Sequence, residues 1–475
     1  MKRRNDSTAL NTDEAQPGDA NACTPENAAT DHAAQHPGET EDILQAIPLE
    51  ASLAPALPEY ARLTPEQVAI ANQTGQWLDA FVAFASAASP LTPPAFHLAA
   101  GIFLGGVAIA RRLYLDLNSS AKIIYPNLYL LNVGPSTVQR TSTALHVVKG
   151  LVEAAGMQHF LQTAQQTPAA LTLDWSTRVP STYTNWQPTL QAKWLQERVI
   201  AAQRGWLLDN AARLLDSYND DYTAGLLPLV WDLYGCPDEA LTRNPLIYQE
   251  ATVKQPYLNI FGVTTDSLMA RHLKKHRWAK SFLKCFVLVG SANVDTWHFW
   301  PGPQVYPADL VQGLQRVATQ LLPLPEASLN VVETTADAQA KPRQTQAAQL
   351  SAPLMAYPVQ LARGGEAWAA WERYARATGF DLLRRDKLAD ICATSYGRLS
   401  TQLIKVAIIL ATFDAPQLPV IVEPCHIYRA QQIVELWRTS LHNVIEKLRH
   451  LRADNAITEE IRGLRGGWAR DGPLG

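Results

Sequence analysis

One turn of the chain, Gly134–Thr143, carries side chains suited to binding phosphate. In a phosphate-binding loop, backbone N–H groups wrap the phosphates, a lysine reaches the terminal phosphates, and a serine or threonine holds magnesium. The turn begins with glycine and ends with three consecutive hydroxyl-bearing residues at the start of an expected helix, where anions are favoured. The spacing therefore predicts a site for ATP and Mg²⁺. The predicted nucleotide ligands are Gly134, Ser136, Thr137, Arg140, Thr141, Ser142 and Thr143, and Ser142 is also a predicted magnesium ligand.

The same turn lacks the lysine of a standard phosphate loop. The standard spacing places Gln139 at the second glycine and Arg140 at the lysine. Arg140 keeps the positive charge, but a planar guanidinium is not equivalent to an ammonium. An ordinary strand-to-helix turn capped by serine and threonine would have a similar composition, and from this turn alone it is the better interpretation.

Polar residues at the ends of two other apolar segments fit the same chemistry. A phosphate loop needs an acid at the end of a neighbouring buried strand for the magnesium shell, and a second carboxylate usually orients the attacking water. Asp209 ends the apolar segment Gly205–Asp209 as the predicted catalytic and magnesium-binding acid, and Asn210 stands where the second carboxylate is expected. Thr264 and Thr265 follow another apolar segment, where ATPases place a polar sensor of the terminal phosphate. A strand or helix end capped by aspartate is the alternative.

The elements that must position these residues alternate between strands and helices. Short apolar runs bounded by turns predict buried strands with helices between them, which is typical of an α/β core with a mostly parallel sheet. We expect a helix at Thr143–Ala155 after the phosphate turn, and a buried helix at Phe96–Ala110 that is too short to span a bilayer. Helical periodicity from Gly365 to Leu451 predicts an all-helical region. The predicted strands are Arg112–Leu117, Asn127–Val133, Gly205–Asp209, Pro256–Thr265 and Phe286–Gly290.

Composition along the chain predicts its organisation. The first segment is rich in small, acidic and proline residues, which indicates disorder. A helix at Pro65–Ala71, with Thr64 as its N-cap, marks the beginning of the ordered chain. The predicted parts are a disordered tail and linker at 1–66, a helical segment and first strand at 67–125, the core at 126–331, a linker or surface loop at 332–364, a helical lid at 365–455, and a flexible C-terminus at 456–475.

The overall composition excludes several classes of protein. Of the 475 residues, 47% are hydrophobic and 18% charged, so a large core can be buried. Residues 1–45 hold three basic and nine acidic side chains, so the remaining chain has 38 basic and 35 acidic ones, which fits a nucleic-acid partner without requiring one. The five cysteines form no Cys-x-x-Cys pair, which favours a reducing cytoplasm over a zinc cluster or a disulfide framework. No apolar signal follows the N-terminal Lys-Arg-Arg, and we expect no membrane partner.

Several motifs give the chain a resemblance to a known family. From about Trp77 to Leu451 it resembles the domain-of-unknown-function 3987 proteins, which are ATPase-like proteins of plasmids, phages and integrated elements. The resemblance implies a P-loop NTPase core of the AAA+ or RecA-like kind with a C-terminal all-helical lid. It also implies a homo-oligomer that acts in DNA replication or mobilisation, with DNA and the replication or mobilisation proteins of the same element as partners. The motifs are Pro126–Thr137, Tyr222–Leu227 with Asp232–Asp238, Pro256–Thr265 and Ser281–Phe286.

The chain departs from this family at three catalytic positions. The family loop carries Arg-Lys-Ser-Thr where this chain has Arg140–Thr143, so in this alignment Thr141 replaces the lysine. The Asp-Glu pair of the family is Asp209–Asn210 here. An arginine of the family, interpreted as an arginine finger, corresponds to Cys285, and the neighbouring Lys284 is the predicted catalytic cation. The resemblance therefore implies slow or absent hydrolysis, and an inactive nucleotide-binding scaffold or regulator is the alternative function.

Three further groups of residues have an open interpretation. Arg398 and Lys405 are two helical turns apart, and the resemblance to helicase lids implies that Arg398 contacts the nucleotide phosphate, although solvated charges flanking a core helix would look the same. The basic and aromatic segment Lys274–Trp278 has a composition that stacks on single-stranded DNA, but a charged loop explains it as well. Packing explains the adjacent Cys425 and His426 better than a metal site, because no other ligands lie near in sequence.

Overall fold

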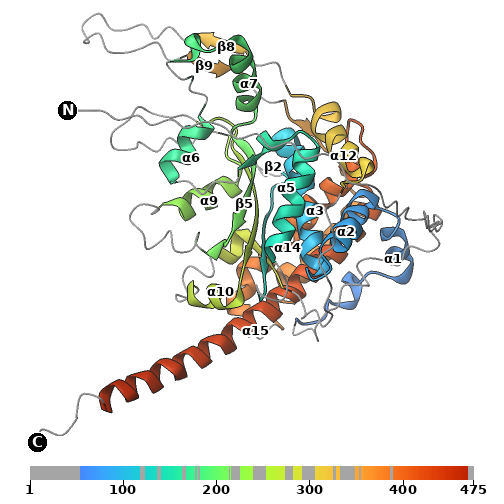
Figure 1. Ribbon diagram of the computed structural model, residues 1–475. Helices are drawn as coiled ribbons and strands as arrows, with labels where there is room; N and C mark the ends of the chain where they lie inside the picture. The colour runs from blue at the N-terminus through green and yellow to red at the C-terminus, as the bar shows by residue number, and fades with distance from the viewer. Residues whose placement is uncertain are drawn as a thin grey trace, which may run out of the picture. The chain divides into compact units, whose positions relative to one another are not determined.

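A sheet of five parallel strands forms the centre of the structure (Figure 1). Every residue of β3, β6 and β7 is buried, because these strands are apolar and are covered by helices. The predicted α/β class with a parallel sheet is therefore confirmed. The strand order is β4-β5-β6-β3-β7, and the bounds are Tyr129–Val133 for β3, Leu161–Gln162 for β4, Gln203–Asp209 for β5, Tyr257–Thr264 for β6 and Phe286–Val289 for β7.

The computed structural model describes most of the chain after residue 53. These residues belong to one compact unit that spans 42–475. The tail predicted at 1–66 lies outside the described residues as far as residue 53. The described residues are 54–117, 123–135, 141–162, 167–176, 179, 182–212, 214, 225–238, 253–272, 282–290, 305–324, 328–331, 348–351, 355–385 and 389–468.

Two smaller sheets lie outside the parallel one. The strand predicted at Arg112–Leu117 is present as β1, but it pairs with β2 and β10 and contributes nothing to the central sheet. The segment predicted as a linker at 332–364 contains two described strands, β9 and β10. The bounds are Leu113–Asp116 for β1, Ile123–Ile124 for β2, Ser328–Val331 for β8, Ala348–Ser351 for β9 and Tyr357–Pro358 for β10.

Helix α3 (Pro94–Ile109) is almost entirely buried against the central sheet. It approaches β5 so closely that a Cβ at Gly205 would lie 2.4 Å from a methyl carbon of Val107. Among the described residues, α3 with the turn that follows it is the one segment long and apolar enough to cross a membrane, and 94% of that window is buried inside the protein. The prediction of a buried helix at Phe96–Ala110 is therefore confirmed.

Alternation along β3 assigns helices to the two faces of the sheet. The Asn132 amide donates to the carbonyl of Phe96 in α3 at 3.4 Å, whereas the Tyr129 hydroxyl donates to the carbonyl of Val230 in α9 at 2.8 Å. Positions 129 and 132 point to opposite faces, so α3 and α9 cover opposite faces. Helix α5 contacts α3 and lies on its face. The bounds are Thr141–Ala154 for α5 and Leu226–Tyr234 for α9.

The described C-terminal part is helical, as predicted for Gly365–Leu451 (Figure 1). Helices α14 and α15 pack along each other, and α13 packs against both. Helix α14 also contacts α3, and α15 contacts β7 and α10, so this part shares a core with the sheet. Helix α15 continues through part of the segment predicted as a flexible C-terminus. The bounds are Asp266–His272 for α10, Glu366–Arg376 for α13, Ala389–Asp414 for α14 and Pro424–Trp468 for α15.

Helix α1 (Pro65–Ala71) begins with the predicted cap. The Thr64 hydroxyl accepts the backbone N–H of Gln67, and the Gln67 side chain accepts the backbone N–H of Thr64, which is a capping box. The other α-helices are α2 (Gln76–Ala88), α6 (Pro168–Trp175), α7 (Pro188–Val199) and α12 (Ala308–Gln315), and the short 3₁₀ and π segments are η1 (Glu59–Ala61), η2 (Ala110–Arg112), η3 (Gln158–Phe160), η4 (Tyr183–Asn185), η5 (Arg316–Leu321) and η6 (Ala377–Asp381).

Candidate functional site

The connections of the parallel sheet create a place for a ligand. The chain passes from β3 to the edge strand β4, returns through β5 to β6, and then crosses β3 to reach β7. The crossovers that leave β3 and β6 therefore run in opposite directions, and right-handed crossovers place their helices on opposite faces of the sheet. In open α/β sheets, ligands bind in the crevice outside the carboxyl ends of such strands. The carboxyl ends of β3, β5 and β6 are therefore the first candidate site.

Two predicted magnesium ligands meet at this end of the sheet. Ser142 lies in the first turn of α5, and Asp209 is the last residue of β5. The Ser142 hydroxyl donates a hydrogen bond to Asp209 Oδ1, with 3.0 Å between the two oxygens. Asp209 is exposed, while Ser142 and the next residue, Thr143, are half-buried. The structure therefore brings together, at an accessible place, two residues that are 67 positions apart.

Strand β6 ends beside the predicted phosphate turn. The backbone N–H of Gly134 donates to the carbonyl of Thr264 at 3.2 Å. The Thr264 hydroxyl is buried and has no hydrogen-bond partner among the described residues, which is rare for a buried polar group. The Thr265 hydroxyl instead accepts the backbone N–H of Leu268 and caps α10. Of the two predicted sensor residues, Thr264 is thus the one whose hydroxyl has no partner in the described part of the chain.

Asn210, at the predicted position of the water-orienting group, has an unusual backbone. Its φ is +64°, in the left-handed region that asparagine enters more readily than most residues. The backbone N–H of the next residue, Ala211, donates to the carbonyl of Val263 at 2.9 Å and holds the bend. Asn210 Oδ1 is buried without a hydrogen-bond partner in the described part of the chain. Unusual backbone and unpaired polar groups of this kind gather at functional sites.

The oxygen pair at the carboxyl end fits magnesium. Mg²⁺ prefers oxygen ligands in an octahedron at about 2.1 Å, and adjacent corners of such an octahedron are about 3.0 Å apart. Ser142 Oγ and Asp209 Oδ1 have that separation, so these two residues would hold the ion, which would neutralise phosphate charge. The predicted phosphate ligands that lie outside the described part are Ser136, Thr137, Arg140 and the side chain of Thr141.

Lys284 and Arg398 lie at the other end of the sheet. Lys284 precedes β7, and Arg398 lies on α14, which passes the amino ends of β3 and β7. Both residues line a cavity of about 470 Å³. The five residues of β3 separate the two ends by roughly 16 Å, at about 3.3 Å per residue. Within one chain, the structure therefore does not bring these two predicted residues to the Ser142–Asp209 pair.

A buried lysine holds α14 against the amino end of the sheet. Lys405 Nζ donates to the backbone oxygen and to the side-chain Oδ1 of Asn127, each at 2.7 Å, and lies 4.3 Å from the centre of the Tyr234 ring. The side-chain amide of Asn127 donates to the carbonyl of Tyr234 at 3.0 Å. Lys405 also lines the cavity with Arg398, so their predicted position on one helix face is confirmed. The interpretation of Lys405 as a solvated charge is wrong, because the residue is buried.

One contact at the carboxyl end of the sheet could not be predicted from the sequence. The Ser440 hydroxyl of α15 hydrogen-bonds to both the N–H and the carbonyl of Gly290, directly after β7. A Cβ at Gly290 would lie 2.5 Å from a methyl carbon of Val444 and 3.8 Å from the carbonyl oxygen of Val133. Helix α15 therefore reaches the end of the sheet that carries the Ser142–Asp209 pair. A serine inside a helical sequence resembles any surface position, so the pattern did not indicate this contact.

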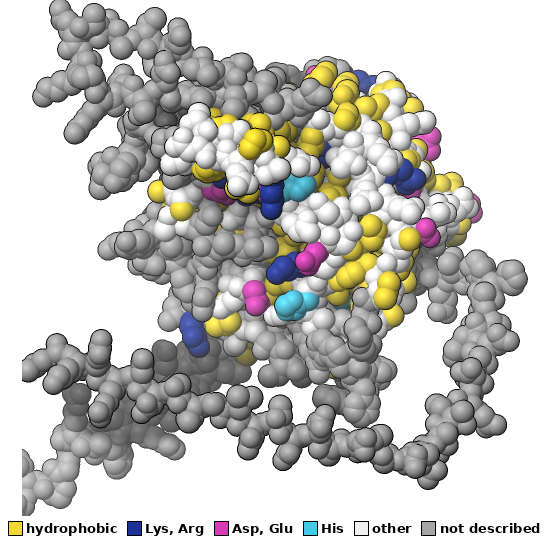
Figure 2. Space-filling view, turned by 45° about the horizontal axis from the view of Figure 1, so that its top comes forward, with side chains coloured by type: hydrophobic (Ala, Val, Ile, Leu, Met, Phe, Trp, Pro, Cys, Tyr) yellow, Lys and Arg dark blue, Asp and Glu magenta, His cyan; other side chains and the backbone are white. Residues whose placement is uncertain are grey.

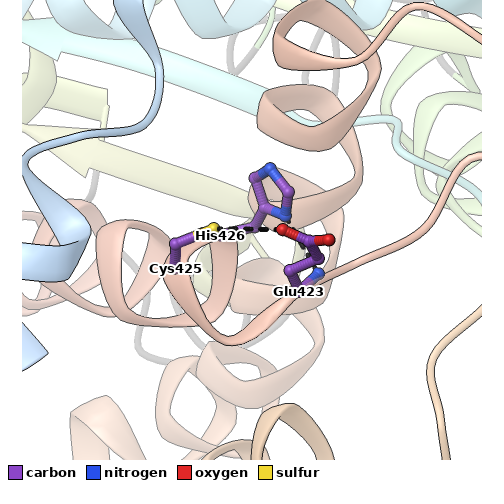
Figure 3. Close-up of side chains that lie close together, drawn as sticks. All are labelled: Glu423, Cys425 and His426. Atoms are coloured by element: carbon purple, nitrogen blue, oxygen red, sulfur yellow. Dashed lines mark hydrogen bonds between the residues drawn. The ribbon is translucent and has the colours of Figure 1, made fainter.

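A cluster of potential metal ligands lies at the start of α15 (Figure 3). Ligand atoms of Glu423, Cys425 and His426 lie within 4.8 Å of one another. Both ring nitrogens of His426 have neighbours: Nδ1 accepts the backbone N–H of Glu423 at 3.0 Å, and Nε2 lies 3.5 Å from Asp414 Oδ2. The first contact is half of a helix-capping box. These contacts support the packing interpretation, because a metal on Nδ1 would have to displace the cap.

The coloured part of the face in Figure 2 gives no separate indication of a nucleic-acid site. On the face shown in Figure 2, the coloured basic and acidic side chains are interspersed and form no continuous basic patch. The segment Lys274–Trp278, for which the sequence left DNA contact open, lies outside the described residues. DNA binding therefore stays a prediction from the resemblance and the charge balance.

Comparison with known proteins adds no family to this geometry. No protein-family model matches the chain, and no curated protein matches it either. The resemblance to the domain-of-unknown-function 3987 proteins thus rests on the sequence motifs alone, and the hydrogen bond between Ser142 and Asp209 is an observation separate from those motifs.

Proposed function

We propose that the chain binds a nucleoside triphosphate with magnesium at the carboxyl end of its sheet, as a P-loop ATPase-like protein. The observation that carries the proposal is the hydrogen bond between Ser142, at the start of α5, and Asp209, at the end of β5. A hydroxyl at the helix start after a glycine turn and an acid at the end of a buried strand are the magnesium-binding parts of a P-loop site. Strand β6 between them ends in Thr264, whose buried hydroxyl has no partner among the described residues and lies where a phosphate sensor would act.

Hydrolysis at this site is proposed to be slow or absent. Asn210 offers an amide where a carboxylate would orient the attacking water, and no lysine lies between Gly134 and Thr143. Losing one group that stabilises the developing charge of a transition state costs roughly 3–4 kcal/mol. A site that keeps the magnesium pair and lacks both other groups would bind a nucleotide more readily than it would cleave it.

A homo-oligomer would give a role to the basic residues at the far end of the sheet. An arginine-finger residue supplied in trans acts on the nucleotide of a neighbouring subunit, so it can lie far from the site of its own chain. Lys284 precedes β7 and Arg398 lies on α14, both at the amino end. A head-to-tail contact between identical chains would bring that end to the neighbour's Ser142–Asp209 pair. In this arrangement, helices α13–α15 would be the lid.

The biological setting is proposed from the resemblance. It is the replication or mobilisation of a mobile genetic element in the cytoplasm, with DNA and other replication proteins of that element as partners. A scaffold or regulator that binds nucleotide without turnover is the second candidate, and Asn210 favours it because a neutral amide cannot act as a base.

Calorimetric titration with ATP and magnesium tests the nucleotide site. We expect binding that requires Mg²⁺ and is lost in Asp209→Ala. The matched control is Asp309→Ala in helix α12. It also removes one exposed aspartate, and it should leave the affinity for ATP unchanged. Absence of heat at millimolar nucleotide, or equal binding by Asp209→Ala, would contradict the proposal.

A second experiment separates the weak ATPase from the scaffold. Thr141→Lys would return an ammonium near the terminal phosphates, and Asn210→Asp would return a carboxylate. Aspartate suits position 210 better than glutamate, because a short polar side chain tolerates the φ of +64°. For a weakened ATPase, phosphate release by the double variant should exceed that of the parent and of each single variant. A double variant that binds ATP and turns over no faster would favour the scaffold.

A further inference from the structure

The cavity at the amino end of the sheet has a strongly unequal charge. Its walls come from α9, β2, the start of β7 and α14. The lining contains three basic side chains, Lys284, Arg398 and Lys405, and one acidic side chain, Asp232. Burial raises the pKa of both thiols of the lining, Cys236 and Cys285, to about 11, so neither is a thiolate that offsets the positive charge at neutral pH. The cavity is therefore suited to an anion.

The three basic side chains of this cavity differ in their contacts with the described residues. Lys405 is held by Asn127 and lies over the ring of Tyr234. Within the described residues, neither Arg398 nor Lys284 has a hydrogen bond or an ion pair, although Arg398 is half-buried. A guanidinium that has lost part of its hydration without gaining a partner is a site where an anion compensates for the loss.

Another part of the lining is aromatic. Trp231 and Tyr125 are half-buried and line the cavity next to Ile123 and Ile124. The indole N–H of Trp231 is buried and has no partner in the described part of the chain. Aromatic side chains stack on nucleic-acid bases of any sequence. The volume of about 470 Å³ lies within the range of pockets that hold a ligand with a ring and a phosphate.

We propose that this cavity binds the phosphate monoester of a nucleoside, with the phosphate between Arg398 and Lys284 and the base beside Trp231. A phosphate monoester carries a charge of about −1.5 to −2 at neutral pH, which matches the two positive charges of Arg398 and Lys284. A free mononucleotide and the 5′-phosphate end of a single strand share this chemistry. Within one chain, the cavity lies at the opposite end of the sheet from the Ser142–Asp209 pair. This site is therefore an alternative to the head-to-tail contact, in which Lys284 and Arg398 would meet a neighbour's nucleotide.

Calorimetric titration of the full chain with AMP in EDTA tests the proposal. AMP should bind without magnesium, and adenosine should not bind. Arg398→Ala and Lys284→Ala should each weaken AMP binding roughly 10- to 100-fold, which is the effect of losing charge-assisted hydrogen bonds. Arg316→Ala and Lys193→Ala are the matched controls at exposed positions of η5 and α7, and should leave the affinity unchanged. Asp209→Ala should also leave it unchanged, which separates this cavity from the proposed magnesium site.

The source of the phosphate is decided with a short oligothymidine that carries either a 5′-phosphate or a 5′-hydroxyl. If the phosphorylated strand binds more tightly than AMP, and if Arg398→Ala removes the preference for the phosphate, the ligand is a nucleic-acid end. If AMP binds at least as well as the phosphorylated strand, the ligand is a free nucleotide. Either result supports the cavity as a nucleoside-phosphate site.

Three results would overturn the proposal. One is no heat from AMP or from the phosphorylated strand at millimolar concentration. Another is an AMP affinity that survives both Arg398→Ala and Lys284→Ala. The third is AMP binding that is lost only in Asp209→Ala, which would place it at the carboxyl end. Should Arg398→Ala fail to fold, as judged by thermal unfolding, Lys284→Glu at an exposed position still decides, because the reversed charge must abolish AMP binding.

Discussion

The two ends of the central sheet use their buried polar groups in opposite ways. At the amino end, Lys405 is buried and donates to two oxygens of Asn127. At the carboxyl end, the Thr264 hydroxyl and Asn210 Oδ1 are buried without partners among the described residues, and the Asn210 backbone is left-handed. Paired buried groups stabilise a fold, whereas unpaired groups cost free energy and persist where a ligand uses them. The difference assigns stability to Lys405 and ligand binding to the carboxyl end. Arg398 and the indole N–H of Trp231, which lack partners in the described part of the amino end, are the exceptions on which the cavity proposal rests.

The largest effect on stability is expected from Lys405→Met. This change keeps the length of the side chain but removes two charge-assisted hydrogen bonds and leaves both Asn127 oxygens without that donor. We expect the free energy of unfolding to fall by roughly 3–5 kcal/mol. Denaturant unfolding measures this as a lower midpoint at constant slope. Lys193→Met, at an exposed position of α7, is the control, and a similarly small loss for both would remove the structural role of Lys405.

A second prediction concerns the loss of folding stability at acidic pH. His97, in the first turns of α3, follows Phe96, whose carbonyl accepts the Asn132 amide near the carboxyl end of β3. Burial lowers the pKa of His97 to about 4, and the backbone of Ser89 opposes part of that shift. Between pH 6.5 and 4 the unfolded chain therefore binds the proton that the folded chain excludes. The stability contributed by a neutral His97 is complete above pH 6.5 and is lost as the pH falls, by about 3 kcal/mol in total.

Unfolding curves at several pH values measure this dependence. His97→Gln should flatten the curve between pH 6.5 and 4, because glutamine does not titrate. His146→Gln, at an exposed position of α5, is the control and should leave the curve as steep as in the parent. If the free energy of unfolding falls as steeply between pH 6.5 and 4 in His97→Gln as in the parent, groups other than His97 cause the loss of stability.

A smaller effect is expected at Asn210, where the backbone and the side chain can be tested apart. Asn210→Ala places a Cβ-bearing residue without a polar group at φ +64°, so it should lower the free energy of unfolding by about 1 kcal/mol. Asn210→Gly adopts this conformation freely and should be neutral or slightly stabilising. Thermal unfolding compares the two. If Asn210→Ala is as stable as Asn210→Gly, the left-handed backbone at residue 210 costs no free energy. The contrast between the two ends of the sheet would then be weaker.

The sequence predicted the elements of the site better than their arrangement. Asp209 and Ser142 could each be predicted as a magnesium ligand, because an apolar strand followed by an acid, and a turn followed by hydroxyls, are local patterns. The strand order was not predictable. Strand β4 has only two residues, Leu161–Gln162, which are too few for any periodicity, and yet it sets the edge of the sheet. Likewise β1 has a clear alternation but pairs with β10, whose two residues give no signal of their own.

The position of the basic residues could be predicted only in part. The spacing of Arg398 and Lys405 correctly placed them on one face of a helix. Helical periodicity says which face is shared, but it does not say which end of a sheet that face meets. That depends on how α14 packs across the amino ends of β3 and β7, through long-range contacts such as the one from Ser395 to the carbonyl of Leu283.

The smallest effect on stability, and the sharpest test of the comparison, is expected from Ser142→Ala. Within the described residues, its hydroxyl makes one hydrogen bond, to the exposed Asp209. Alanine also has a higher helix propensity than serine, by a few tenths of a kcal/mol, which offsets part of the loss. We therefore expect the free energy of unfolding to change by less than about 0.5 kcal/mol, while magnesium-dependent ATP binding falls. Thr189→Ala is the matched control, because it removes an exposed hydroxyl from the first turn of another helix, α7, and Thr189 is not among the predicted nucleotide ligands. Paired denaturant unfolding and calorimetry on both variants separate the outcomes. The contrary outcome is that Ser142→Ala loses more than about 1 kcal/mol of stability and binds ATP as the parent does. In that case the hydrogen bond between Ser142 and Asp209 would stabilise the fold, as the contacts of Lys405 do at the amino end, and the contrast between the two ends would be wrong.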